Sequence, residues 1–349
     1  MTEITTGFGI IGATVAVVVS ALSVAYLANP ASPLRWMDRP NERSMHALPI
    51  PRTGGLGILL GLAAGWFGTA VLISPPSAWI WLLSGIVVVA AVSMLDDARG
   101  LGVLPRLAAH VLAAGLLLGA GWHLEASTIF LPGQLWEFPP KVGAALIVLF
   151  TIWMVNLYNF MDGIDGLAAG MAIIGFSTMG LLGFLGGDPT FAALNLTVAM
   201  AAAGFLLFNL PPARIFMGDT GASVFGFLAA TSMLWAQYAG LFPLWAGLLL
   251  FSPFIVDATG TLLVRILAKK RFWEAHRQHC YQQFARSALG PKRTLYSGYA
   301  LMLAAAVSAV LATCSESAAL QTFTLLGWTL AYAVLCTTLW AIRSRQANA

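Results

Sequence analysis

Eleven long apolar stretches divide the chain, and they constrain its fold more than any other feature. The stretches cover residues 7–28, 55–74, 79–95, 106–122, 141–158, 166–186, 190–209, 220–238, 243–267, 296–314 and 320–342. An α-helix needs about 20 mostly apolar residues to cross the hydrocarbon core of a bilayer. Charged residues make up 9% of the chain, against about 25% in soluble domains. The sequence therefore predicts an all-α polytopic membrane protein with about 11 transmembrane helices, in a single integral membrane domain over residues 1–349.

Basic residues are distributed unevenly between the two sets of alternate connections. One set comprises the loops 29–54, 96–105, 159–165, 210–219 and 268–295 and the C-terminal tail. In the opposite set only Lys141 is basic. Cytosolic loops collect Lys and Arg, so we expect the first set to be cytosolic, the N-terminus periplasmic and the C-terminus cytosolic. The net charge of +4 then reflects topology and contact with membrane lipids, and gives no reason to expect nucleic acid binding.

Polar residues recur every third position where the fifth apolar stretch ends. Asn156, Asn159, Asp162 and Asp165 lie within the segment NLYNFMDGIDGLAA. On a continuous helix they would form one polar stripe, and the glycines beside them would let a ligand approach the backbone. Polar packing between helices is the alternative. Two carboxylates without a nearby basic residue favour a divalent cation or a polar ligand instead.

Two further acidic motifs lie at the predicted cytosolic ends of spans. Asp96 and Asp97 stand where the third span leaves the membrane, and adjacent carboxylates repel each other unless a cation neutralises them. A solvated helix end is the plain alternative. In the segment NLPPARIFMGDTGAS, Asn209 and Arg214 precede Asp219. Its Gly-Asp-Thr-Gly can present backbone N–H groups to a phosphate while Asp219 offers oxygen to Mg²⁺, although an ordinary helix cap has the same pattern.

The segment HRQHCYQQF begins at His276 in the basic loop 268–295. His276 and His279 would share a helical face, and Arg277 and Gln282 add donors. A zinc site needs further ligands at closed spacing, so an anion-binding segment is favoured, since Arg binds phosphate in bidentate fashion. A basic patch at the membrane surface is the remaining alternative.

Two other positions give weaker signals. Arg52, in PRTGG at 51–55, marks a helix entry. Asp257 lies within the ninth span, where it would line a cavity or pair with Arg265.

Carboxylates, glycines and basic groups at one membrane face suit Mg²⁺-assisted phosphoryl transfer, in which positioning and charge neutralisation supply most of the catalysis. A site at the membrane surface further implies that one reactant is a lipid.

Taken together, these motifs resemble the polyprenyl-phosphate N-acetylhexosamine-1-phosphate transferase superfamily. The resemblance runs in the same order over residues 35–290. The segment from His276 is similar to that of bacterial O-antigen-initiating and general undecaprenyl-phosphate transferases. Muramoyl-pentapeptide transferases normally have a run of histidines there. The motifs that carry the resemblance are PRTGG, DDARGL, NLYNFMDGIDGLA, NLPPARIFMGDTGAS and HRQHCYQQF.

The resemblance implies a multi-pass enzyme of the bacterial inner membrane that transfers an N-acetylhexosamine 1-phosphate from a UDP-sugar to undecaprenyl phosphate, releases UMP and initiates O-antigen or related polysaccharides. It implies Mg²⁺, with Mn²⁺ as a substitute, and is compatible with a homodimer. Matching motifs assign Asp162 and Asp219 to the metal and Asp96, Asp97 and Asp219 to catalysis. They assign the substrates to Arg52, Arg106, Asn159, Asp165, Asn209, Phe216, His276, Arg277, His279 and Gln282.

The resemblance departs from the common pattern at RLAAH, where many members have Lys and Gln in place of Arg106 and His110.

The chemistry needs no strong base, because the second pKa of a phosphate monoester is about 6. Direct attack of the lipid phosphate is the preferred mechanism, with an aspartyl-phosphate route as the alternative. Muramoyl-pentapeptide transfer is the alternative within the superfamily. A secondary transporter is the alternative from another class, although transporters place their sites near the bilayer midplane.

Overall fold

The computed structural model describes residues 2–40, 48–70, 79–122, 124, 126–127, 132, 136–270, 277–315 and 317–347. Helices account for nearly all of its regular structure. They are α1 (Thr2–Ala28), α2 (Gly54–Ala70), α3 (Trp79–Arg99), α4 (Val103–Gly119), α5 (Pro140–Phe160), α6 (Leu167–Leu185), α7 (Pro189–Asn209), α8 (Gly218–Tyr238), α9 (Leu244–Leu250), α10 (Ser252–Leu267), α11 (Cys280–Arg286), α12 (Gly290–Cys314) and α13 (Ala318–Ala347). Two short antiparallel pairs join β1 (Met37–Asp38) to β2 (Ile50–Pro51) and β3 (Ala126–Ser127) to β4 (Trp136–Glu137).

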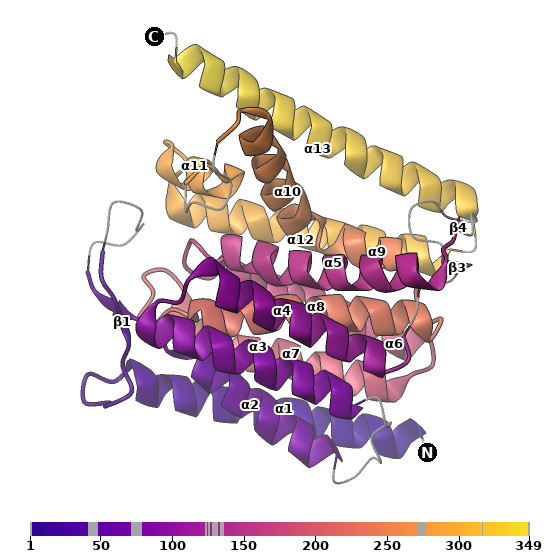
Figure 1. Cartoon of the computed structure of the whole chain (residues 1–349), viewed down its shortest axis with the longest axis horizontal. Coiled ribbons are helices and arrows are strands. Elements are labelled where there is room, and N and C mark those ends of the chain that lie inside the picture. The colour runs from indigo at the N-terminus through magenta and orange to yellow at the C-terminus, as the bar shows by residue number, and fades with distance from the viewer. Residues whose placement is uncertain are drawn as a thin grey trace.

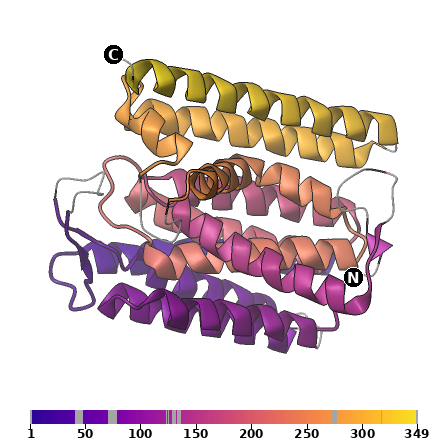
Figure 2. The ribbon, with the colours of Figure 1, turned by 45° about the horizontal axis from the view of Figure 1, so that its top comes forward.

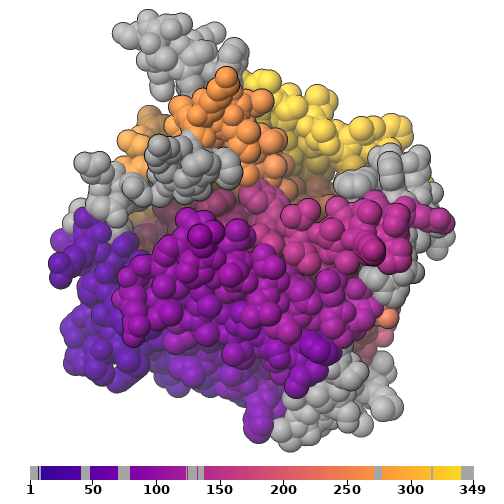
Figure 3. Space-filling view, viewed as in Figure 1, coloured from indigo at the N-terminus to yellow at the C-terminus, as the bar shows by residue number. Residues whose placement is uncertain are grey.

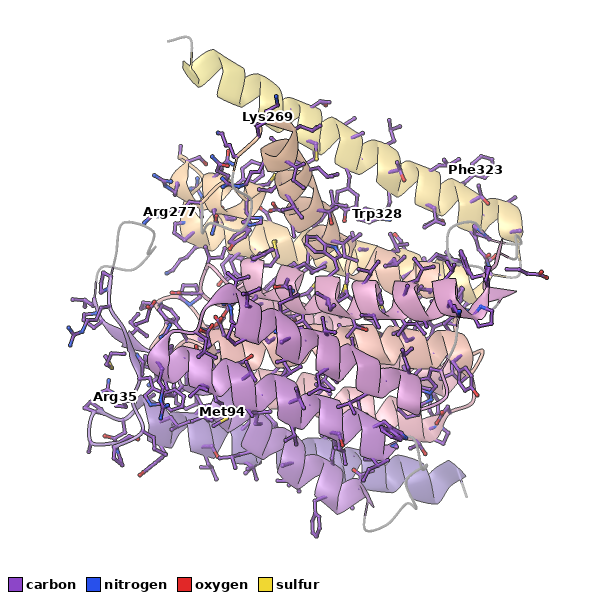
Figure 4. The ribbon with its side chains drawn as sticks, in the orientation of Figure 1. Arg35, Met94, Lys269, Arg277, Phe323 and Trp328 are labelled. Carbon is purple, nitrogen blue, oxygen red and sulfur yellow. The ribbon has the colours of Figure 1, made fainter. Side chains whose placement is uncertain are left out.

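Successive long helices run up and down one elongated bundle (Figure 1). One end carries β1 and α11, and the other carries β3 and β4. Arg35 and Arg277, far apart in the sequence, both lie at the end with β1 and α11 (Figure 4). The helices thus bring the basic connections to one end, as the alternating charge pattern predicts. Which side of the membrane that end faces stays a prediction.

Seven helices in the described part of the chain are long and apolar enough to cross a membrane: α1, α3, α5, α6, α7, α12 and α13. The multi-pass prediction is confirmed to that extent, whereas the count of eleven stays a prediction. The apolar stretch 243–267 does not form one straight span. It divides into α9 and α10, which meet at an angle of 79°. Pro253 lies in the first turn of α10, and proline is a common cause of such breaks.

Helix α8 occupies the centre of the bundle, although it is not among those seven. Every residue from Thr220 to Leu234 is buried, packed against α3 and α5 among others. Its many Gly, Ala, Ser and Thr residues lower its hydropathy but let neighbouring backbones approach closely, as is usual between membrane helices. In the space-filling view α3 and α4 cover much of one face of the bundle (Figure 3). The N-terminus of α8 therefore lies deep at the end that carries the acidic motifs.

Helices α12 and α13 form a separate layer above the rest of the bundle (Figure 2). Helix α13 buries little of its surface. Its Tyr332 hydroxyl lies 2.7 Å from the hydroxyl of Ser252, at the break between α9 and α10. This buried contact ties α13 to the broken helix.

Candidate active site

Asp97, near the end of α3, caps the central helix α8. Its carboxylate accepts hydrogen bonds from the backbone N–H of Asp219 at 3.0 Å and of Thr220 at 2.9 Å, and from the Thr220 hydroxyl at 2.6 Å. Asp97 is 3% exposed. A carboxylate at a helix N-terminus satisfies unpaired N–H groups and the helix dipole. The expectation that these N–H groups present themselves to a phosphate is therefore wrong, because Asp97 already accepts from them.

A single guanidinium joins the other two acids predicted to be catalytic. Arg106 Nη1, on α4, lies 2.9 Å from Asp96 Oδ2 and 3.1 Å from Asp219 Oδ2. About a third of the Arg106 and Asp219 side chains is exposed, so both can be reached from outside. Asp96 is more enclosed and also accepts from the Leu101 backbone N–H. The structure thus gathers Asp96, Asp97 and Asp219 from two helices at one end of the bundle.

Only the first two residues of the predicted polar stripe, Asn156 and Asn159, lie on a helix. Helix α5 ends at Phe160, so Asn156 and Asn159 lie on the helix while Asp162 and Asp165 lie in the following loop. The glycines of that loop explain the break, since Gly166 adopts a φ of +80° that an L side chain rarely tolerates. Asn159 interacts with the Asp219 carboxylate.

Asp162 lies in the electrostatic field of the other acids. Burial and repulsion by the carboxylates of Asp219, Asp97 and Asp165 raise the pKa of Asp162 to about 8. Such a shift marks a place where negative charge is in excess. A cation bound there would relieve the repulsion.

Two residues predicted to contact a nucleotide hold the neighbouring loops together. The Asn209 amide accepts from the Gly166 backbone N–H at 2.8 Å and donates to the Ile215 carbonyl at 2.9 Å. Asp165 accepts from the Ala213 backbone N–H at 2.9 Å. These bonds connect the loop after α5 to the loop before α8. Their contact with a nucleotide stays a prediction.

PRTGG is more than a helix entry. The Gly54 and Gly55 N–H groups each donate at 2.9 Å to the carbonyls of Phe216 and Met217, and Phe216 N–H donates to the Pro51 carbonyl at 2.8 Å. Phe216 is half-buried in this ladder. A Cβ on Gly55 would lie 2.6 Å from the Met217 carbonyl oxygen. The segment before α2 therefore packs against the FMGD motif.

Arg52 and Gly218 complete this packing against α3. Arg52 Nη2 donates to the Asp97 carbonyl at 2.7 Å, and its Nε lies 3.9 Å from the Asp97 carboxylate. Gly218 has a φ of +68°, and a Cβ there would lie 2.7 Å from Asp97 Oδ2. Only glycine fits this position between Asp97 and the start of α8.

The HRQHCYQQF segment folds back onto the end of α5. His279 precedes α11, which starts at Cys280, so the expected helical face shared with His276 does not form at His279. Its ring stacks on Phe160, with centroids 5.9 Å apart. Gln282 lies near Gly163, and Arg277 is half-buried at the same end. His276 lies outside the described residues.

The residues fit a divalent cation in part. No three His, Cys, Asp or Glu side chains in the described ranges are arranged to hold a metal by themselves. Mg²⁺, however, is usually bound through one or two carboxylates plus substrate phosphates. Asp162 and Asp219 provide two carboxylates; Asp219 is paired with Arg106, whereas burial and repulsion by neighbouring carboxylates raise the pKa of Asp162.

A pocket of about 920 Å³ opens beside the carboxylates. Arg35, Asp165, Phe208 and Arg214 line it. The Arg214 guanidinium sits 4.7 Å from the centre of the Phe208 ring. Asp165 thus borders this pocket, whereas Asp96, Asp97 and Asp219 belong to the neighbouring cluster.

Sequence reasoning gave too little weight to several positions. Thr220 donates twice to Asp97, and its place after Asp219 was the available signal. Asp257 accepts from the backbone of α11, and an acid inside an apolar stretch was a sufficient reason to search for its partner.

Comparison with known proteins identifies similar sequences among membrane transferases. Residues 79–237 match the family model described as glycosyl transferase family 4. The chain is 27% identical over 302 residues to the probable undecaprenyl-phosphate N-acetylglucosaminyl 1-phosphate transferase of Bacillus subtilis, covering 85% of this chain and 84% of that protein. It is 32% identical to the decaprenyl-phosphate N-acetylglucosaminephosphotransferase of Mycobacterium tuberculosis, over 58% of this chain and 54% of that protein. It is 29% identical to the phospho-N-acetylmuramoyl-pentapeptide-transferase of Levilactobacillus brevis, over 61% and 68%.

Proposed function

We propose that this chain is a member of the polyprenyl-phosphate N-acetylhexosamine-1-phosphate transferase superfamily, to whose members it is similar, and that it uses a UDP-sugar and undecaprenyl phosphate. In this proposal it transfers the sugar 1-phosphate to the lipid phosphate at the cytosolic membrane face and releases UMP. The product would initiate O-antigen or a related cell-envelope polysaccharide.

One observation carries the proposal. Asp96, Asp97 and Asp219 converge from α3 and α8 at one end of the bundle, where Arg106 joins Asp96 to Asp219 and Asp97 accepts from the Asp219 N–H. Asp162 lies close enough for the carboxylates of Asp97 and Asp219 to repel its own. Phosphoryl transfer between two anionic substrates depends on neutralising and positioning charge. Mg²⁺, held by Asp162 and Asp219, would supply that neutralisation. The cluster lies at the surface end of the helices, where a lipid phosphate and a soluble nucleotide can meet.

The hydrogen bonds favour different roles for the two adjacent acids, Asp96 and Asp97. Asp97 accepts three hydrogen bonds from the start of α8, which favours a role in holding Asp219 in place. Asp96 faces Arg106, whose guanidinium is partly exposed. A guanidinium binds phosphate oxygens well, so in this proposal Arg106 holds the lipid phosphate and Asp96 orients Arg106. The phosphate oxygen then attacks the sugar-side phosphorus directly.

Two pockets offer room for the rest of each substrate. The pocket lined by Arg35, Asp165 and Arg214 would take the nucleotide. A second pocket of about 390 Å³ lies between α10, α11, α12 and α13. Its lining is mostly apolar and includes Phe254, Phe284 and Met302. We assign it to the first isoprene units of the lipid.

The test is a parallel assay of UMP release. Purified protein with undecaprenyl phosphate and Mg²⁺ receives UDP-GlcNAc, a UDP-N-acetyl-6-deoxyhexose or UDP-muramoyl-pentapeptide. We expect UMP from at least one of the first two, and a fall in kcat of about 10³-fold or more for Asp219→Asn, since it removes a metal ligand and the partner of Arg106. Asp188→Asn, at the opposite end of the bundle, is the control. UMP from the pentapeptide substrate alone would instead establish the muramoyl reaction, and near-normal turnover by folded Asp219→Asn would refute the metal assignment.

A further inference from the structure

Asp257 connects two helices through its carboxylate. It lies on α10, and its Oδ1 accepts from the Cys280 backbone N–H at 2.8 Å while its Oδ2 accepts from the Tyr281 N–H at 2.9 Å. The Thr261 hydroxyl also donates to Oδ1 at 3.2 Å. These backbone groups begin α11, which has no capping side chain of its own at His279. Asp257 therefore fixes where α11 starts.

The same carboxylate borders His279. The His279 Nδ1 atom lies 3.4 Å from Asp257 Oδ1, and the two side chains are 4% and 9% exposed. This contact is at the edge of the imidazole ring. The face of the ring stacks on Phe160, with centroids 5.9 Å apart. Asp257 and Phe160 thus enclose His279 in one orientation.

Tyr281 extends the connection to the acidic loop. Its hydroxyl donates to the Phe160 carbonyl at 2.9 Å, at the end of α5. A Cβ on Gly163 would collide with that hydroxyl, so the contact needs glycine in the loop that carries Asp162. A continuous series of contacts therefore runs from Asp257 through Tyr281 to the residue beside Asp162.

Asp257 lies on the helix that follows the break. Helix α10 leaves α9 at 79° and lies beside α11 in Figure 1, and the two helices are in contact. The acid of the bent apolar stretch therefore belongs to the segment that contacts α11.

We propose that Asp257 is a positioning residue for the donor diphosphate: it holds the α11 segment, which carries Gln282 and follows His279, against the loop that carries Asp162. The proposal rests on the proposed function in taking a UDP-linked donor. Asp257 itself is 9% exposed and its oxygens accept from protein groups, so it acts on the donor through α11, while it also lines the pocket assigned to the lipid.

Binding of UDP and UMP to the purified full chain tests the proposal without requiring turnover. UDP carries the second phosphate that α11 would hold, whereas UMP lacks it. We expect Asp257→Ala to weaken UDP binding by about tenfold or more and to leave UMP binding within about twofold. Asp257→Asn keeps one acceptor oxygen and should lose less. Asp188→Ala is the matched control, because Asp188 caps α7 through the Phe191 N–H at 2.9 Å and should change neither value.

Hydrogen exchange supplies the structural readout. The Cys280 and Tyr281 amides should exchange faster in Asp257→Ala than in the wild type, and Asp188→Ala should leave them unchanged. If Asp257→Ala does not fold, nucleotide binding and hydrogen exchange are measured on Asp257→Asn instead, and its results decide the proposal. Equal weakening of UDP and UMP, or no weakening of either, would overturn the positioning role. So would a wild-type protein that binds UDP no more tightly than UMP. Asp257-dependent UDP binding in a protein that releases no UMP from any UDP-sugar would refute the proposed function and sustain this inference.

Discussion

Arg106 is the residue on which the charges of the site depend. It sits between Asp96 and Asp219 at hydrogen-bond distance from both, while Arg52 donates a hydrogen bond to the backbone carbonyl of Asp97. Asp162 has no comparable salt bridge among those found in the described residues. Burial of Asp162, together with repulsion by the carboxylates of Asp219, Asp97 and Asp165, raises the pKa of Asp162 to about 8.

The raised pKa predicts that cation binding depends on pH. Asp162 has a higher pKa in the fold than its ordinary value of 3.8, so its ionisation costs stability as pH rises toward 8. Below pH 8 a cation must displace the proton, because carboxylate ligands bind metal when deprotonated. We expect Mg²⁺ affinity to rise up to about tenfold per pH unit between pH 6 and 8 and to level off above.

Calorimetry in buffers of different ionisation enthalpy measures both the affinity and the proton release. Asp162→Asn should bind Mg²⁺ more weakly and remove the pH dependence. A wild-type affinity that stays constant from pH 6 to 8 would contradict the assignment of Asp162 to the metal.

The sequence identified the acids of the site, but not the hydrogen bonds that each one makes. Asp96, Asp97 and Asp219 stand out because charge in an apolar chain is costly. Their partners Arg106 and Thr220 lie on α4 and α8. No local sequence pattern shows that Asp97 caps a helix whereas Asp96 pairs with a guanidinium. That distinction depends on how α3 packs against α8, which is a tertiary contact.

At the scale of elements, the N-terminus of α8 is stabilised by a carboxylate from α3. Asp97→Asn would turn one acceptor oxygen into an N–H₂ group facing the backbone N–H groups of Asp219 or Thr220. A buried donor facing a donor costs about 1–3 kcal/mol. We expect Asp97→Asn to lower the free energy of unfolding by about 2 kcal/mol and to abolish UMP release.

Asp96→Asn is the matched comparison on the same helix end. It can keep the hydrogen bond from the Leu101 N–H but turns an N–H₂ group toward Arg106, whose partly exposed guanidinium can turn to water. Its thermal midpoint should therefore fall less than that of Asp97→Asn, while UMP release falls by about 10²-fold or more. Thermal unfolding in detergent and UMP release, measured side by side, separate the two residues. If Asp97→Asn melts like the wild type, the capping role assigned to Asp97 is wrong.

The helices themselves were easier to predict than their breaks. Each apolar stretch corresponds to a helix or, at 243–267, to the bent pair α9 and α10. Hydropathy reports the length of an apolar stretch and not its direction, so it gave no sign of the 79° bend. Helix α5 also ends at Phe160, before the last two residues of the predicted polar stripe, Asp162 and Asp165, since the glycines of GIDG favour a loop.

At the scale of the whole molecule, the asymmetry of charge predicts the orientation in the membrane. The end that carries α11 and the acidic cluster also carries Arg35 and Arg277 (Figure 4), and basic loops favour the cytosol. The opposite end of α12 is marked by Cys314, which is exposed. Helix α12 covers Gly290–Cys314 and is long and apolar enough to cross a membrane, so we expect its two ends on opposite sides of the bilayer. The native cysteines therefore allow a direct test.

Labelling with a membrane-impermeant maleimide measures the orientation of α12. In a Cys280→Ser, Cys336→Ser protein, Cys314 should react in right-side-out vesicles and not in inside-out vesicles. In a protein without native cysteines, Ser287→Cys, in the exposed turn before α12, should react only in inside-out vesicles. Reversal of both results would place the carboxylate cluster outside, where a cytosolic nucleotide sugar cannot reach it, and would refute the proposed reaction at that face. Reaction of both cysteines from the same side would show that α12 does not cross the membrane.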